Sequence, residues 1–280
     1  SPAAPPRQSN WWVYIILVAI CLLNFIPYFW MILTGFMDRS TSTGAVPQWI
    51  FTPTLEAFDY LISEKRVLLN LRNSAIVALG STFFSILIGM FAAYALARYD
   101  FVGKDDVSFW VLTNRMMPPV AVILPIFITF QTLKLLDTLG GLILLYTALN
   151  LPFVVWMLTG YFRDIPKRYE ESAMVDGDSW FGAFRKVTLP LIAPGIAAAG
   201  LLAFAISIDD FVVSNFNAGQ TITFPLYVYG AARQGVPPQV NVLATMIIIV
   251  VVGLMFVNVA AQRRLARRDA ALPSDAVVAG

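Results

Sequence analysis

The sequence contains no histidine and a single cysteine, Cys21, among 280 residues. Without histidine the chain has no Ser-His or Cys-His nucleophile pair, no HExxH zinc site and no imidazole proton relay. One cysteine forms neither a disulfide within the chain nor a cysteine metal cluster. We therefore expect no catalytic residue, no metal site and no cofactor.

The sequence also lacks a phosphate-binding loop. Its one Gly-Lys pair, Gly103 and Lys104, is without the upstream glycine and the following serine or threonine of such a loop. Any ATP that this protein uses is therefore expected to be hydrolysed by another chain. The net charge of +2 gives no reason to expect a nucleic-acid partner.

Charged residues are scarce, at 13% of the chain, whereas 58% of residues are apolar and the mean hydropathy is +0.72. This composition departs from that of soluble domains and predicts an integral membrane protein. The apolar residues gather into runs of about 20 residues or more, long enough to cross a bilayer core of about 30 Å as helices. Six spans are predicted, over residues 11–35, 74–97, 107–133, 140–162, 191–216 and 240–262.

Lysine and arginine predict the orientation of these spans. If the N-terminus is cytoplasmic, that side carries roughly twice as many of these residues as the other side, in agreement with the positive-inside rule. The first span is longer than a signal-peptide core of about 7–15 residues and is expected to remain as a helix. The sequence thus predicts cytoplasmic tails over residues 1–10 and 263–280, and between them a six-helix domain over residues 11–262.

A charged, turn-containing loop over residues 163–190 separates the fourth and fifth predicted spans. Asp164 can cap a helix whose first turns hold Glu170 and Glu171, acids that suit a positive helix N-terminus. Gly177 can end this helix, because glycine adopts the left-handed conformation at little cost. Ser179 can cap a second helix, which Pro190 is expected to interrupt. An amphipathic helix that only connects two spans at the membrane surface is the alternative interpretation.

The spacing in this loop resembles that of the cytoplasmic loop of permease subunits of binding-protein-dependent ABC importers. The family pattern reads Glu-Ala-Ala, two residues, Asp-Gly, then a distal Phe and Leu-Pro. Ser172 and Asp178 stand where this family usually has alanine. The six spans, the long outer loop after the first, the "ARYDFVGK" inner turn and the basic C-terminal tail are also similar to the family. The matching positions are Glu171, Ala173, Asp176, Gly177, Phe184, Leu189 and Pro190.

The resemblance implies an all-α permease fold with both termini in the cytoplasm of a bacterial or archaeal cell. It also implies that the loop forms a coupling helix, which fits a cleft in an ATPase subunit. The implied partners are a second permease subunit, two ATP-binding cassette ATPase subunits, an extracytoplasmic solute-binding protein and the lipid bilayer. The loops over residues 37–73 and 217–239 would meet the binding protein. The implied coupling residues are Glu171, Ala173, Asp176, Gly177, Phe184 and Pro190.

Different parts of the chain resemble permeases for different solutes. From "MMPPVAVILP" to "ESAMVDG" the chain is similar to carbohydrate permeases of the maltose type, whereas "ISIDDFVVSNF" and the residues after it look more like spermidine/putrescine permeases. A carbohydrate is the favoured solute and a polyamine is the alternative. A self-contained channel or a polytopic membrane enzyme is disfavoured. A channel would usually show an internal repeat, and none is visible in the sequence. An intramembrane aspartyl protease needs acids on two spans, whereas Asp209 and Asp210 are adjacent on one.

Three charged residues within the predicted spans are candidates for the substrate pathway. Asp209 and Asp210 lie deep in the fifth span, where acids usually face a cavity, a partner or the headgroup region. One of them can instead cap a helix or pair locally, for example with Arg233. Arg115, in the third span, is either a pathway group or the partner of an acid. Three prolines in that span suggest that it is broken where it faces protein or water: Pro118, Pro119 and Pro125.

Small residues recur every four positions in the second span. Ser81, Ser85, Gly89 and Ala93 lie on one face of a helix there and allow another helix to approach closely. We expect this face to be a packing surface within the chain or a contact with another subunit.

Overall fold

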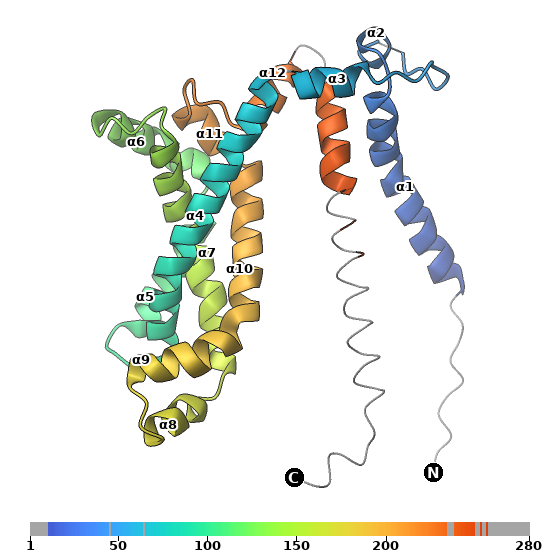
Figure 1. Ribbon diagram of the computed structural model, residues 1–280. Coiled ribbons are helices and arrows are strands. Elements are labelled where there is room, and N and C mark those ends of the chain that lie inside the picture. Colours follow the sequence, from blue (N-terminus) through green and yellow to red (C-terminus); the bar gives the residue numbers. More distant parts are fainter. Residues whose placement is uncertain are drawn as a thin grey trace, which may run out of the picture. The chain divides into compact units, whose positions relative to one another are not determined.

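The computed structural model describes residues 11–44, 46–63, 65–233 and 238–249, together with Gly253 and Phe256. Across these residues the regular elements are helices, and none is a strand (Figure 1). Four helices are long and apolar enough to cross a membrane, over Trp11–Gly35, Arg66–Arg98, Leu139–Asp164 and Trp180–Asp209. The predicted all-α membrane architecture is therefore confirmed for the described part of the chain. The number of six spans stays a prediction.

The chain divides into two compact units, Ser1–Lys65 with Ala231–Gly280, and Arg66–Gly230. The first unit contains α1 (Trp11–Gly35), α2 (Arg39–Ser42), α3 (Glu56–Ser63) and the helix Pro238–Ile249. Of the α1 residues only Thr34 and Gly35 are buried. At that end the Asn241 Nδ2 donates to the Thr34 Oγ1 at 2.9 Å. The rest of α1 exposes apolar side chains, as a helix surrounded by lipid would.

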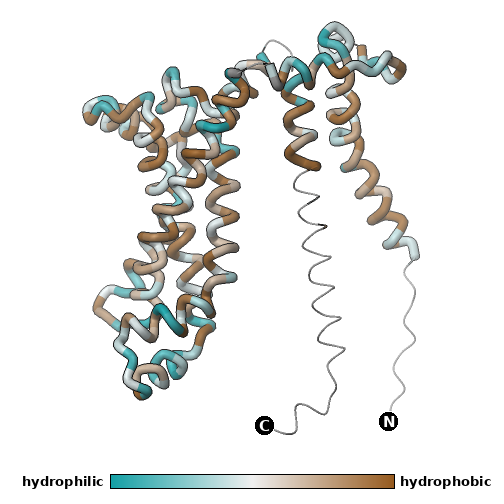
Figure 2. The backbone as a smooth tube through the Cα atoms, in the orientation of Figure 1, coloured by the Kyte–Doolittle hydropathy of each residue, from teal (hydrophilic) through white to brown (hydrophobic). Residues whose placement is uncertain are grey.

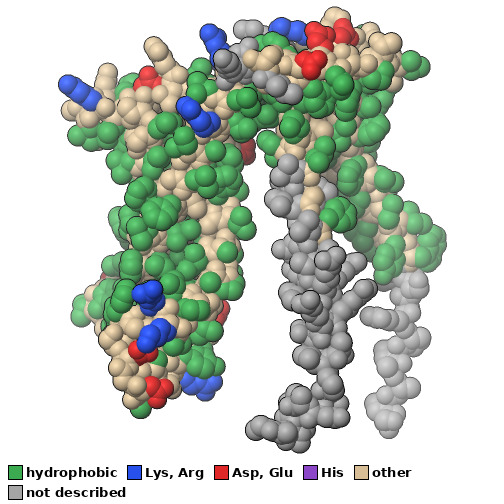
Figure 3. Space-filling model, in the orientation of Figure 1, with side chains coloured by type: hydrophobic (Ala, Val, Ile, Leu, Met, Phe, Trp, Pro, Cys, Tyr) green, Lys and Arg blue, Asp and Glu red, His purple; other side chains and the backbone are tan. Residues whose placement is uncertain are grey.

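The second unit is built around α7 (Leu139–Asp164), which packs against α10 (Leu189–Asp209) and α5 (Lys104–Met116). Half of the residues in the most apolar stretch of α7 are buried. In Figure 2 the long helices of this unit are hydrophobic in the middle, and in Figure 3 Lys and Arg side chains gather at the two ends of the same unit. Its remaining elements are α4 (Lys65–Arg98), α6 (Pro119–Thr132), α8 (Arg168–Val175), α9 (Trp180–Ala183), a π turn (Phe184–Thr188), α11 (Val212–Asn217) and α12 (Phe224–Ala232).

The small-residue face of α4 packs against α7. A Cβ added to Gly89 would lie 2.9 Å from the Val154 Cγ1, closer than carbon atoms approach without strain. The Ser85 hydroxyl donates to the Thr147 carbonyl at 3.2 Å. Ser81, Ser85 and Ala93 have no exposed surface. This face is therefore a packing surface within the chain.

The third predicted span is two helices. α5 ends at Met116 and α6 begins at Pro119, and Met117 and Pro118 between them are extended. The break follows from the prolines, because proline disfavours the helical conformation of the residue before it and donates no backbone hydrogen bond. The predicted interruption is confirmed at Pro118 and Pro119, whereas Pro125 lies inside α6 and does not break it.

The fifth predicted span differs from the structure at both ends. The helix starts at Trp180, and Pro190 does not interrupt it, because the π turn Phe184–Thr188, which ends two residues before the proline, widens the helix there. At its other end the helix stops at Asp209, and Asp210 is extended. The second predicted span also begins earlier, in the helix that starts at Lys65.

The sixth predicted span is described over Pro238–Ile249, and beyond that point only Gly253 and Phe256 are described. The predicted tails over residues 1–10 and 263–280 lie outside the described residues.

Candidate functional site

The charged loop between α7 and α10 forms the end of the second unit, as Figure 1 shows at α8 and α9. We call residues 165–188 the α8–α9 loop. The expected cap at Asp164 is wrong. Asp164 remains in the last turn of α7, Ile165 is extended, and Lys167 occupies the N-cap position of α8 without forming a side-chain capping hydrogen bond to that helix. The first turn of α8 carries Glu170 and Glu171, as predicted.

Gly177 turns the chain at the end of α8. Its φ is +96°, and its N–H donates to the Met174 carbonyl at 3.1 Å. A Cβ at this position would meet nothing within 4 Å, so the requirement for glycine comes from the backbone conformation and not from crowding. The predicted helix end is confirmed.

Ser179 begins the second loop helix in the predicted way. It is extended, with φ −70° and ψ 162°, and its Oγ accepts a hydrogen bond from the Gly182 N–H at 3.1 Å. The helix that starts here continues through the π turn into α10. The second half of the α8–α9 loop is therefore continuous with α10.

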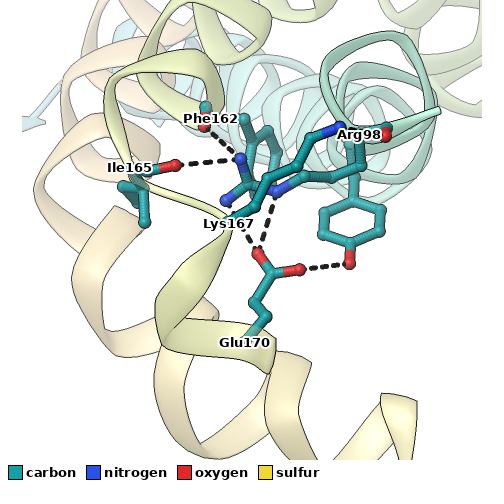
Figure 4. Close-up of polar contacts among 6 residues, drawn as sticks. Arg98, Phe162, Ile165, Lys167 and Glu170 are labelled. Carbon is teal, nitrogen blue, oxygen red and sulfur yellow. Dashed lines mark hydrogen bonds and ion pairs between the residues drawn. The ribbon is translucent and has the colours of Figure 1, made fainter. Parts of the chain in front are cut away.

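An ion pair between Arg98 and Glu170 lies buried where α4 meets the α8–α9 loop (Figure 4). The Arg98 Nε donates to the Glu170 Oε1 at 2.9 Å, and the Arg98 Nη2 lies 2.7 Å from the same oxygen. The Arg98 Nη1 donates to two carbonyl groups at the end of α7, those of Phe162 and Ile165, each at 2.9 Å. The two charged side chains are only 5% and 9% exposed. Arg98 thus joins the ends of α4, α7 and α8.

Further contacts complete this cluster. The Tyr94 hydroxyl donates to the second Glu170 oxygen, Oε2, at 2.7 Å, and the Lys167 Nζ donates to the Arg98 carbonyl at 2.8 Å. The Tyr94 ring contacts the ring of Phe184 edge-on, at 5.1 Å between centroids. Because both oxygens of Glu170 accept hydrogen bonds, much of the desolvation cost of the buried carboxylate is offset.

The predicted coupling residues fall into two groups. Glu171, Asp176 and Gly177 are exposed on the loop, and so is Pro190 at the start of α10. Ala173 is half-buried, and Phe184 is buried against Tyr94. The structure therefore does not place all of these residues on one surface. Apolar side chains accompany the exposed acids on the loop: Tyr169, Met174, Val175, Trp180 and Phe181.

The pairing of Glu170 with Arg98 was not predicted, because the local pattern assigned Glu170 a role only as an acid near a helix N-terminus. One signal was available: Arg98 and Glu170 carry opposite charges, and each follows a predicted span at the end that the lysine and arginine bias predicts to be cytoplasmic.

The helix breaks at Met117 and at Asp210 both border a cavity of about 350 Å³. Asn150 is nearly fully buried in its wall, and its Nδ2 donates to the Ser207 Oγ at 2.6 Å. The Ser207 Oγ in turn lies 3.2 Å from the Ser81 Oγ. The cavity is lined by Asn114, Met117, Tyr146, Leu149, Asn150, Ile206 and Asp210.

Asp210 accepts hydrogen bonds from nearby groups in the wall of this cavity. Its Oδ1 accepts from the Val213 N–H at 2.8 Å, and its carbonyl accepts from the Tyr146 hydroxyl at 3.1 Å. The local capping alternative is thus confirmed for Asp210, with Val213 as the donor. Asp209 is exposed, and both acids line a second, more open cavity of about 580 Å³. The backbone of Arg115 lies in α5, but its side chain is outside the described part of the chain, so its role stays a prediction.

Comparison with known proteins identifies close relatives. The chain is 36% identical over 215 residues to the sulfoquinovosyl glycerol transport system permease SmoH of Agrobacterium fabrum, a match that covers 75% of each chain. It is 33% identical to the spermidine/putrescine permease PotC of Escherichia coli, over 76% of this chain and 80% of PotC. It is 32% identical to the trehalose/maltose permease MalG of Thermococcus litoralis, over 71% of this chain and 70% of MalG.

The fold is also shared with a solved transporter. A chain in the crystal structure of a bacterial ABC transporter that imports the acidic polysaccharide alginate superimposes with a TM-score of 0.72 at 20% identity, over 94% of this chain and 99% of that one. Residues 85–269 match the family described as the binding-protein-dependent transport system inner membrane component. The chain therefore belongs to this family, the inner-membrane permease subunits of binding-protein-dependent ABC importers.

Proposed function

We propose that this chain forms half of a carbohydrate pathway across the inner membrane and receives the energy of ATP hydrolysis through the α8–α9 loop. One observation carries the proposal. The loop is fixed to α4 and α7 by the buried Arg98–Glu170 pair, and it is continuous with α10 through the π turn. A loop held in this way presents a rigid surface that a second protein can bind and displace.

The exposed residues of the loop suit an ATPase subunit as that second protein. Val175 is 86% exposed and Phe181 is 58% exposed, which makes an apolar surface, and Glu171 and Asp176 add negative charge beside it. An apolar centre with charges at its rim is the usual composition of a protein interface. The complex would comprise this chain, a second permease subunit, two ATPase subunits and an extracytoplasmic solute-binding protein.

The proposal includes the topology. Six spans with cytoplasmic termini place the α8–α9 loop in the cytoplasm and the segment over residues 37–63 outside. In that outer segment Ile50 is 95% exposed and Trp49 is also exposed, so apolar surface is available for the binding protein. The bias of lysine and arginine supports this orientation.

Cysteine labelling tests the topology. In a Cys21→Ala background, Val175→Cys is expected to react with a membrane-impermeant maleimide only in inverted vesicles, and Ile50→Cys only in intact spheroplasts. Both positions are exposed, so a lack of reaction in one preparation reports the side of the membrane. Labelling of Val175→Cys from outside would contradict the cytoplasmic position of the loop.

The 350 Å³ cavity supports a carbohydrate as the solute. Apart from Asp210, its polar lining consists of uncharged groups, the Asn114 and Asn150 amides and the Tyr146 hydroxyl. Amides and phenols both donate and accept hydrogen bonds, as sugar hydroxyl groups require. The carboxylate of Asp210 already accepts a hydrogen bond from the Val213 N–H. The similarity to SmoH and MalG points in the same direction.

A polyamine is the second candidate, and it also rests on a specific observation. Asp209 and Asp210 both line the more open cavity of about 580 Å³, and two carboxylates there would attract a polycation. The similarity to PotC agrees with this alternative.

Uptake measurements separate the two solutes. Deletion of the gene for this chain is expected to abolish uptake of a labelled carbohydrate, tested with disaccharides and glycosyl glycerols, and to leave spermidine and putrescine uptake unchanged. Restoring the gene on a plasmid is the control. If only polyamine uptake is lost and restored, the carbohydrate proposal is wrong.

A further inference from the structure

We infer that Arg98 and Glu170 are positioning residues that join α4 to the α8–α9 loop, so that α4 moves together with α10 when the loop is displaced. This inference rests on the proposed function of the loop. It assigns the buried ion pair a role in transmitting motion, in addition to any effect on stability.

The two helices are attached to the loop in different ways. α10 is continuous with α9 through the π turn, so the backbone itself transmits displacement. α4 has no chain connection to the loop, because the whole of α5, α6 and α7 lies between them in the sequence. Its polar contacts there are made by the Tyr94 and Arg98 side chains to Glu170, by Arg98 to the Ile165 carbonyl, and by Lys167 to the Arg98 carbonyl.

Arginine is suited to this junction. Its planar guanidinium has donors that point in several directions, and here they reach Glu170 of α8 and the carbonyls of Phe162 and Ile165 together (Figure 4). The two carbonyls lie at the end of α7, and Glu170 lies in α8. The junction therefore resists both sliding and rotation of α4 against the loop.

α4 connects this junction with the cavity. It is an unbroken helix without proline, and it rises about 25 Å between Arg98 and Ser81. The Ser81 Oγ lies 3.2 Å from the Ser207 Oγ of α10, and Ser207 accepts a hydrogen bond from Asn150 in the cavity wall. Displacement of α4 and α10 as a pair keeps the contact between Ser81 and Ser207, whereas displacement of α10 alone would break it.

Glu170 and Glu171 should therefore have different functions although they are neighbours. Glu170 is buried and faces Arg98, and Glu171 is exposed on the loop. Substitution of Glu171 is expected to weaken the association with the ATPase. Loss of the Arg98–Glu170 pair is expected to leave the ATPase bound while less solute is moved for each ATP hydrolysed. A purely structural role would lower the amount of complex without changing this ratio.

The main test is the double variant Arg98→Met/Glu170→Met. Replacement of a buried ion pair by apolar residues of similar volume is often tolerated, so the variant can fold and assemble. We expect ATPase co-purification within about twofold of the wild type and a decrease of about tenfold in solute uptake per ATP hydrolysed, within the range typical of coupling between distant sites.

Lys104→Ala is the matched control. Lys104, the first residue of α5, forms an ion pair with Asp100 at 2.8 Å, and its hydrogen bond lowers the pKa of the Asp100 carboxyl. This hydrogen bond joins the start of α5 to the turn before it and not α4 to α8, so its loss is expected to change neither ATPase association nor uptake per ATP.

A second variant, Arg98→Lys, provides the test if the double variant does not accumulate in the membrane. Arg98→Lys keeps the positive charge, but one ammonium group cannot hold the carboxylate and both carbonyls in the arginine geometry. It is expected to accumulate and to lower uptake per ATP by about threefold to tenfold. A normal ratio in Arg98→Lys, or a normal ratio in the double variant, would overturn the inference. Loss of the ATPase together with uptake in both variants would also overturn it, since the pair would then serve assembly alone.

The proposed function of the loop is tested separately by Glu171→Lys, which leaves Arg98 and Glu170 in place. If Glu171→Lys loses the ATPase while the ion-pair variants behave as the wild type, only the inference about α4 fails. If Glu171→Lys retains normal ATPase association and normal uptake per ATP, the proposed role of the loop itself fails, and the inference fails with it.

Discussion

The acidic residues that precede and follow α10 in the chain, Glu170 in the α8–α9 loop and Asp210 after the helix, are satisfied in different ways. Glu170 pairs with Arg98, which lies 72 residues earlier in the chain. At the other end, the Asp210 side chain accepts from Val213, three residues further on. An acid with a distant partner thus fixes helices to one another, whereas an acid with a neighbouring partner shapes only its own turn. Substitutions at the two ends should therefore have effects of different size and reach.

The largest effect is expected for Glu170→Ala. This change leaves the Arg98 charge buried without its carboxylate, which typically costs about 3–5 kcal/mol of unfolding free energy. Thermal unfolding of the purified complex, followed by the loss of monodisperse protein, measures it. Asp178→Ala is the control, because it removes an ion pair with Lys186 that is largely exposed and typically contributes about 0–1 kcal/mol. Equal destabilisation by the two variants would refute the distinction.

Gly177→Val comes next. A β-branched residue at φ +96° is strained by about 1–3 kcal/mol, and the strain displaces the tip of the loop. We expect the chain to insert normally while ATPase co-purification and uptake fall. Gly103→Val is a matched control, because Gly103 also has a positive φ, +84°, with nothing near its missing Cβ, but lies in the turn before α5. A similar loss of uptake in both variants would indicate that strain alone, and not its position, decides the outcome.

The difference between the two ends also explains what the sequence could predict. Gly177 and Ser179 act through backbone and side-chain geometry within three residues, so their roles as helix end and helix cap could be predicted from the pattern. The capping role of Asp210 was among the alternatives for the same reason. The break between α5 and α6 followed from the prolines, which act on their immediate neighbours.

Other features depended on groups that are distant in sequence or on a compensating distortion. The Arg98–Glu170 pair was missed, because the local pattern already gives Glu170 a role at its helix N-terminus and its partner lies 72 residues away. Pro190 was expected to interrupt the helix, but the π turn before it lets the helix continue. The fifth span was predicted to extend to residue 216, because hydropathy does not detect the change of direction at Asp210. In each case the folded structure adds a contact, a distortion or a helix end that the local sequence pattern does not contain.

A smaller effect is expected for Asp210→Ala. Loss of the acceptor for the Val213 N–H should cost about 1 kcal/mol, as is typical of a helix cap. Asp210→Asn keeps an acceptor oxygen at the same place and should retain most of the stability. The thermal midpoint of each purified complex provides the comparison. If the asparagine variant is as unstable as the alanine variant, the negative charge of Asp210 and not its hydrogen bond is what matters.

The smallest effect is expected for Asp209→Asn. Asp209 is exposed at the end of α10, and the substitution keeps the size of the side chain while it removes the charge, so the unfolding free energy should change by less than about 0.5 kcal/mol. For a neutral carbohydrate, uptake should also stay within about twofold of the wild type, because a change that small is worth less than about 0.5 kcal/mol of binding. A polyamine would respond differently, since one carboxylate contact at an effective dielectric constant of about 20 is worth a few kcal/mol before desolvation. We would measure initial uptake rates for labelled carbohydrate and spermidine at several salt concentrations. A large, salt-dependent loss of spermidine uptake in Asp209→Asn would favour the polyamine alternative and show that an acid at this end of α10 also acts beyond its own turn.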